Sequence, residues 1–144
     1  MTAAEQTNAL VHELMVANSM GGQFTHDVPD GWPIDAWRLL LETTSEQWDT
    51  ESLHFWLAGQ MLAPDEVVRI LAASPLMRVR WRIATKRRLP VDLFAVLAAD
   101  DDEGVRNAIA QNTKTPRSIL LGMRADRAEE VRRLVERRVR KSGP

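Results

Sequence analysis

The sequence contains no cysteine. This absence excludes disulfides, thiolate nucleophiles and metal or iron–sulfur sites with cysteine ligands, and it fits a reducing compartment. No run of apolar residues approaches the length of a membrane span. The first 16 residues carry Glu5 and Glu13 but no Lys or Arg, unlike the positively charged start of a signal peptide. We therefore expect a soluble, cytoplasmic protein without a membrane partner.

Basic residues are scarce in the first half of the chain. Residues 1–76 contain only Arg38 and Arg69 against 11 acidic residues, a net charge of −9, whereas residues 77–144 contain 17 basic and 9 acidic residues, a net charge of +8. The total charge of −1 hides this asymmetry. The basic half predicts contact with an acidic protein or with nucleic acid, and the opposite charges of the two halves make self-association a further alternative.

A recurrence of 26 residues organises the chain from residue 64 onward. The composition, 44% hydrophobic and 27% charged over 144 residues, supplies enough apolar side chains for the core of one domain. Several independent positions share the spacing: Pro64, Pro90 and Pro116; Val79-Arg80, Val105-Arg106 and Val131-Arg132; Ile83, Ile109 and Val135; and Ser74, Asp100 and Asp126.

Each 26-residue unit is predicted to form two short helices. Proline is tolerated in the first turn of a helix, so the recurring prolines mark the start of the first helix, with Thr115 as the N-cap before Pro116. In the second helix Val79 and Ile83 lie four residues apart and form one apolar stripe. One unit cannot bury its stripe alone, but stacked units can.

The chain before the regular units follows a different pattern. Residues 3–19 are predicted to form an amphipathic helix with Leu10, Val11 and Leu14 inward, and Gly21-Gly22 is predicted to end it. We expect an all-α fold in one continuous domain. A helical N-terminal cap with a degenerate first repeat would occupy residues 1–62, and a short helical-repeat solenoid with a basic C-terminal capping helix would occupy residues 63–144.

The best-preserved unit resembles the leucine-rich repeat variant family, a HEAT-like helical solenoid. The resemblance implies a right-handed superhelix of α-helices and short 3₁₀ helices, and a binding scaffold rather than an activity. Thr113 departs from it, because proline is usual there, and the cysteine cluster that holds an iron–sulfur centre in the founding members is absent. The matching motifs are Leu97-Ala98-Ala99-Asp100, Val105-Arg106, Ile109-Ala110-Gln111-Asn112 and Thr115-Pro116.

The recurring arginines allow two interpretations. Arg80, Arg106 and Arg132 would form a ridge that grips a phosphate backbone if they were unpaired and exposed to solvent. Alternatively, each arginine pairs inside the protein with a recurring carboxylate such as Asp100 or Asp126.

A second candidate site lies on the predicted helix at residues 75–88. Trp81 is about 200° around the helix from Val79, so it should point away from the core and share a face with Arg78 and Arg82. The equivalent positions in later units are Asn107 and Arg133. An exposed Trp beside arginines would anchor a protein or stack on a base, and burial of Trp81 between units is the alternative.

Other clusters have a functional and a structural interpretation. Lys86-Arg87-Arg88 and the tail at residues 137–141 could bind nucleic acid, or they form a solvated turn and a basic helix end. Residues 100–103 could bind a hard metal ion, but acidic residues directly before a helix favour capping. The three histidines lack the spacing of a zinc site; they are His12, His26 and His54. Four tryptophans of the N-terminal part form either a ligand pocket or the core of the cap; they are Trp32, Trp37, Trp48 and Trp56.

The sequence therefore predicts a non-enzymatic binding scaffold without cofactor, metal ion or catalytic residues. The partner is an acidic protein or peptide segment held on a basic concave face, and nucleic acid on the same face is the alternative. The predicted partner-binding residues are Arg78, Trp81, Arg82, Arg88, Arg106 and Arg133.

Overall fold

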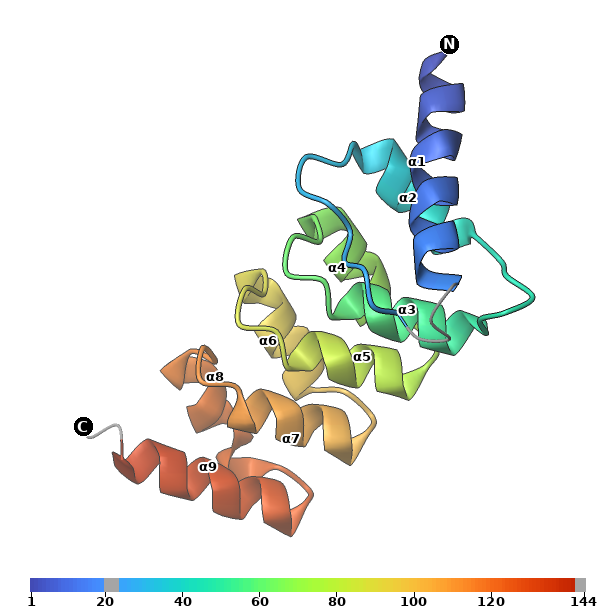
Figure 1. Cartoon of the computed structure of the whole chain (residues 1–144). Helices are drawn as coiled ribbons and strands as arrows, with labels where there is room; N and C mark the ends of the chain where they lie inside the picture. Colours follow the sequence, from blue (N-terminus) through green and yellow to red (C-terminus); the bar gives the residue numbers. More distant parts are fainter. Residues whose placement is uncertain (20–23, 142–144) are drawn as a thin grey trace. The chain divides into compact units, whose positions relative to one another are not determined.

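The computed structural model describes residues 1–19 and 24–141, and every regular element in these ranges is a helix (Figure 1). The all-α prediction is confirmed. Within these ranges no helix combines the length and apolar character that crossing a membrane requires. The elements are α1 (Ala3–Ser19), α2 (Ile34–Glu42), α3 (Thr50–Ala58), α4 (Asp65–Ala72), α5 (Met77–Ala84), α6 (Val91–Ala98), α7 (Glu103–Gln111), α8 (Arg117–Gly122), the 3₁₀ helix η1 (Met123–Ala125) and α9 (Glu129–Lys141).

The chain divides into two compact units, Met1–Val67 and Val68–Pro144. The division falls inside α4, a few residues after the boundary predicted between residues 62 and 63. The prediction of one continuous domain stays a prediction.

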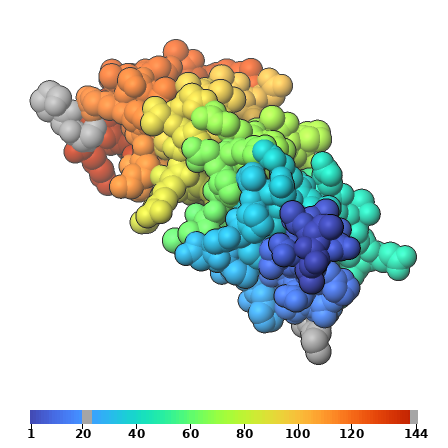
Figure 2. Space-filling view, turned by 90° about the horizontal axis from the view of Figure 1, so that it is seen from above, coloured from blue at the N-terminus to red at the C-terminus, as the bar shows by residue number. Residues whose placement is uncertain are grey.

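The first unit contains α1, α2 and α3. Helix α1 packs against α2, and Figure 2 shows α1 end-on with the neighbouring part of its unit beside it. The predicted inward residues Val11 and Leu14 are buried and Leu10 is half-buried. Trp37 on α2 is only 2% exposed, which places it in the core. The predicted helix end at Gly21-Gly22 lies outside the described residues.

The second unit arranges its helices in two rows. Helices α5, α7 and α9 follow one another in one row, and α6 and α8 lie in the other (Figure 1). The predicted apolar stripe of the first row is buried, because its branched side chains face the core rather than water. Its members, all fully buried, are Val79, Ile83, Val105, Ile109, Val131 and Val135.

The helices begin one residue later than the sequence suggests. Pro116 has extended backbone dihedrals and is itself the N-cap of α8, without a side-chain cap. The prediction that Thr115 caps this helix is therefore wrong, since Thr115 lies one position too early. Its buried hydroxyl instead donates to the Ile109 carbonyl at 2.6 Å.

The polar position between the two helices of each unit forms the same turn each time. The side-chain oxygens of Ser74, Asp100 and Asp126 accept the backbone N–H two residues onward, at 3.1, 2.9 and 2.8 Å. Asp102 then caps α7 by accepting the Val105 N–H at 3.1 Å. The capping interpretation of the acidic cluster is confirmed for Asp102, and Asp100 shapes the turn that precedes it.

Candidate functional site

Two of the recurring arginines are paired inside the second unit. Arg80 Nε lies 2.9 Å from Asp100 Oδ2, and Arg106 Nε lies 3.0 Å from Asp126 Oδ2. The carboxylate of Asp100 raises the pKa of Arg80, with the hydrogen bond as the main cause. Arg106 is only 5% exposed. Burial therefore removes Arg106 from the predicted partner-binding residues.

An open groove crosses α5, α7 and α9, the row of second helices. It consists of a hollow of about 250 Å³ around Trp81 and a larger hollow of about 870 Å³ around α9. Asn107 and Gln111 line both hollows, so the two adjoin each other. Two series at the 26-residue spacing contribute to this lining: Trp81, Asn107 and Arg133, and Thr85, Gln111 and Arg137. We call this surface the α5–α7–α9 groove.

Trp81 provides the apolar end of the groove. Its side chain is 39% exposed, so the alternative of full burial between units is wrong. The described neighbours that line the same hollow are mostly polar, among them Thr85, Asn107 and Gln111. A half-exposed indole in a polar hollow offers apolar area to a partner and loses little conformational entropy when it is covered.

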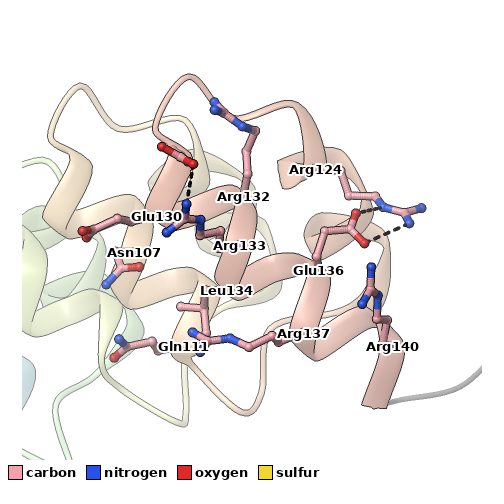
Figure 3. A pocket seen from close by; sticks show the side chains of 11 residues that line it. Asn107, Gln111, Arg124, Glu130, Arg132, Arg133, Leu134, Glu136, Arg137 and Arg140 are labelled. Atoms are coloured by element: carbon pink, nitrogen blue, oxygen red, sulfur yellow. Dashed lines mark hydrogen bonds and ion pairs between the residues drawn. The ribbon is translucent and has the colours of Figure 1, made fainter.

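The α9 end of the groove carries charge of both signs. Five arginines and three glutamates line the larger hollow. Arg133 pairs with Glu129 and Arg124 pairs with Glu136, each at 2.7 Å (Figure 3). The Arg124 guanidinium, and to a lesser degree that of Arg140, lowers the pKa of Glu136. Among the described residues, Arg137 and Arg140 have no carboxylate within ion-pair distance, which leaves this end of the groove able to accept an acidic group. The arginines are Arg124, Arg132, Arg133, Arg137 and Arg140.

The other predicted site residues lie away from this lining. Arg78 and Arg88 are exposed but line neither hollow of the groove. Arg82 is half-buried and donates to the Thr85 hydroxyl at 3.2 Å. Trp81 and Arg133 are therefore the predicted residues that the structure brings into the groove.

Sequence reasoning missed a position where side chains hold the preceding turn. Asn112 Nδ2 donates to the carbonyls of Ala84 and Lys86, at 2.9 and 2.8 Å. Arg138, 26 residues later, donates to the carbonyls of Ala110 and Asn112, at 2.7 and 2.8 Å. Because Asn112 and Arg138 are different residue types, only their 26-residue spacing could have indicated from the sequence that they have equivalent roles. Arg138 is thereby a structural part of the basic tail.

The turn at Lys86-Arg87-Arg88 combines a half-buried and two exposed cations. Burial lowers the pKa of Lys86 to about 8, and repulsion by the Arg82 charge adds to this effect. Arg87 lines the hollow around Trp81. The charge of this turn therefore depends on pH in the mildly alkaline range.

The aromatic residues of the first unit pack mainly on one another. Phe24 lies 4.2 Å from the Trp48 ring and 4.6 Å from the Trp56 ring, between centroids, and Trp32 packs edge-on against Trp37. A hollow of about 310 Å³ in this unit is lined by parts of α1 and α2 and includes no tryptophan. His54 contacts the Leu41 carbonyl at 2.9 Å, so its ring takes part in a contact inside this unit.

Comparison with protein-family models, with curated proteins and with solved structures found no match. Among residues 1–19 and 24–141, no three or more His, Asp or Glu side chains come together in a way that could hold a metal ion.

Proposed function

We propose that the chain is a non-enzymatic scaffold whose α5–α7–α9 groove binds an acidic segment of a partner protein. The observation that carries this proposal is that the hollow around the half-exposed Trp81 adjoins the hollow that arginines line at α9. Tryptophan and arginine are the residue types that contribute most to protein interfaces. An extended peptide with an apolar residue at one end and carboxylates at the other would match this order of side chains.

We further propose that residues 64–140 form a short right-handed helical-repeat solenoid like those of the leucine-rich repeat variant family. What supports this is that turns, ion pairs and groove residues recur at the same 26-residue spacing. Arg80 binds Asp100 as Arg106 binds Asp126, and the groove series steps from α5 to α7 to α9. In such arrays each helix pair contributes one strip of a common binding face.

The alternative partner is nucleic acid. Exposed cations outside the groove lining, such as Arg88 and Lys141, favour it. The three glutamates in the larger hollow oppose it, since they repel a phosphate backbone. For this reason an acidic polypeptide of lower charge density is the partner we favour.

Fluorescence anisotropy of the full chain with a labelled peptide that has leucine at one end and glutamates at the other tests the proposal, with single-stranded DNA as the second probe. We expect the peptide to bind, and both Trp81→Ala and Arg137→Gln to weaken binding roughly tenfold. Arg88→Gln is the matched control, because it removes one exposed cation outside the groove lining. An equal loss with Arg88→Gln would place the contact elsewhere.

DNA binding that falls steeply with salt, without peptide binding, would overturn the proposal in favour of nucleic acid. A molecular mass that falls as the salt concentration rises would identify the acidic partner as a second copy of the chain.

A further inference from the structure

The second unit builds the same arginine–aspartate site twice. Arg80 donates Nε and Nη2 to Asp100 at 2.9 and 3.3 Å, and Arg106 donates the same two groups to Asp126 at 3.0 and 3.3 Å. In both cases Nη1 donates to the carbonyl six residues earlier, at 2.9 Å. This backbone bond fixes the plane of the guanidinium, so the Nε and Nη2 edge can bind a carboxylate in bidentate fashion.

Arg132 is the third member of this series. Its Nη1 donates to the Asp126 carbonyl, six residues earlier, at 2.6 Å. Its Nε and Nη2 edge has no carboxylate partner among the described residues. The nearest acids on α9 are engaged elsewhere, since Glu129 pairs with Arg133 and Glu136 pairs with Arg124. Arg132 is thus oriented by the backbone in the same way as the two arginines that hold aspartates.

The face of α9 beside Arg132 differs from the equivalent faces of α5 and α7. At the 26-residue spacing Ala84 and Ala110 are fully buried, whereas the third position is Glu136, which is partly exposed and paired with Arg124. Covering Glu136 with another packed helix pair would desolvate this ion pair. A further stacked unit, or a second copy stacked in the same manner, is therefore not the occupant that this face fits.

We propose that Arg132 binds the side chain of an aspartate that a partner protein presents in a turn. In the two internal sites the aspartate carboxylate also accepts the N–H two residues onward, from Asp102 and from Ala128. The same turn in a partner would present its carboxylate to the Nε and Nη2 edge of Arg132. Glu136 on the adjacent turn of α9 disfavours a phosphate, which carries more negative charge than a carboxylate.

Arg132 lines the α9 hollow of the α5–α7–α9 groove. Its side chain extends toward the loop that precedes α9 and away from Gln111 and Leu134 (Figure 3). The proposal does not depend on the contacts of Trp81, so Trp81→Ala should leave it intact.

Side-chain NMR of the ¹⁵N-labelled full chain tests the proposal, with the capped peptide Ala-Asp-Arg-Ala-Glu-Glu, the sequence of residues 125–130, as the probe. We expect the Arg132 Nε–Hε signal to shift on titration. Arg132→Lys keeps the charge but loses the fork of two N–H groups, and it should weaken binding roughly tenfold. A peptide with Asn in place of Asp should bind with a comparable loss.

Arg88→Lys is the matched control, since it changes an exposed arginine outside the groove lining, and thermal unfolding of both variants verifies that they fold. Unchanged peptide binding by folded Arg132→Lys would overturn the proposal. Displacement of the peptide by inorganic phosphate at equal concentration would overturn it as well, because the site would then bind anions without selecting a carboxylate.

Discussion

The two units of the chain hold their loops in different ways. In residues 68–144 one set of contacts recurs at a fixed spacing, as in the pairs that Arg80 and Arg106 make with aspartates 20 residues onward. In residues 1–67 the loops are held by different hydrogen bonds that do not recur at a fixed spacing. Asn18 exchanges hydrogen bonds with the His26 backbone, and Gln60 accepts the buried Val28 N–H at 2.8 Å.

This difference explains which unit carries the candidate site. Recurrent contacts place equivalent residues in a row, so substitutions at one position per unit create a continuous surface such as the α5–α7–α9 groove. The individual contacts of the first unit instead include a cluster of half-buried aromatic rings.

The strongest test of this regularity is the Arg106–Asp126 pair, whose side chains are each 6% exposed. Arg106→Met should lower the free energy of unfolding by about 3–5 kcal/mol, because it leaves the Asp126 carboxylate buried without its partner. Arg80→Met should cost less, since the Arg80 side chain is 18% exposed and water can solvate Asp100 in part. Urea unfolding followed by circular dichroism measures both values. Equal losses of unfolding free energy in the two variants would show that the contribution of these ion pairs to stability does not increase with burial.

Asn112 tests whether the turn contacts stabilise the same unit. Asn112→Ala removes both donors to the carbonyls of Ala84 and Lys86, and it should cost about 1–3 kcal/mol in the same measurement. Thr113→Ala is the control, because Thr113 is adjacent and exposed. A loss no larger than that of the control would mean that the turn is held by other contacts.

Lys86 should give the second unit a pH dependence in the alkaline range. Its pKa of about 8 lies below the ordinary value of 10.5, so the folded chain binds fewer protons than the unfolded chain between these values. Stability should therefore rise with pH from about 8 toward 10.5. The chain has three lysines, so ¹³C NMR can follow Lys86 directly, and Arg82→Gln should raise its pKa. A Lys86 signal that titrates near 10.5 would contradict this prediction.

The smallest effect is expected at the exposed pair of Arg69 and Asp92, whose atoms lie 2.6 Å apart. The Arg69 guanidinium lowers the pKa of the Asp92 carboxyl, mainly through the hydrogen bond. Arg69→Gln should return this pKa toward 3.8 with no resolvable change in stability at pH 7, because water screens exposed pairs. NMR titration of the Asp92 carboxyl measures the shift. A clear loss of stability in Arg69→Gln would show that this exposed ion pair stabilises the fold in the same way as the buried pairs.

Much of the fold follows from the sequence because apolar spacing determines which faces are buried. The four-residue spacing of Val79 and Ile83 predicted a buried stripe, and both are fully buried. Whether Arg106 faced solvent or a carboxylate was undetermined, because the distance of 20 residues to Asp126 has meaning only once the turns are placed. The role of Asn112 was hidden, since a different residue type occupies the equivalent position in the next unit.

Glu136 stands where the two preceding units have the buried residues Ala84 and Ala110, and this difference determines where an additional unit could be inserted. A duplicated 26-residue segment inserted before residue 117 would meet small buried side chains like Ala84 and Ala110 at its new junctions. The same segment fused after residue 141 would trap the Arg124–Glu136 pair under a new helix, at a desolvation cost. We expect soluble expression of the first fusion and aggregation of the second, so engineering of longer variants should proceed from the interior of the array.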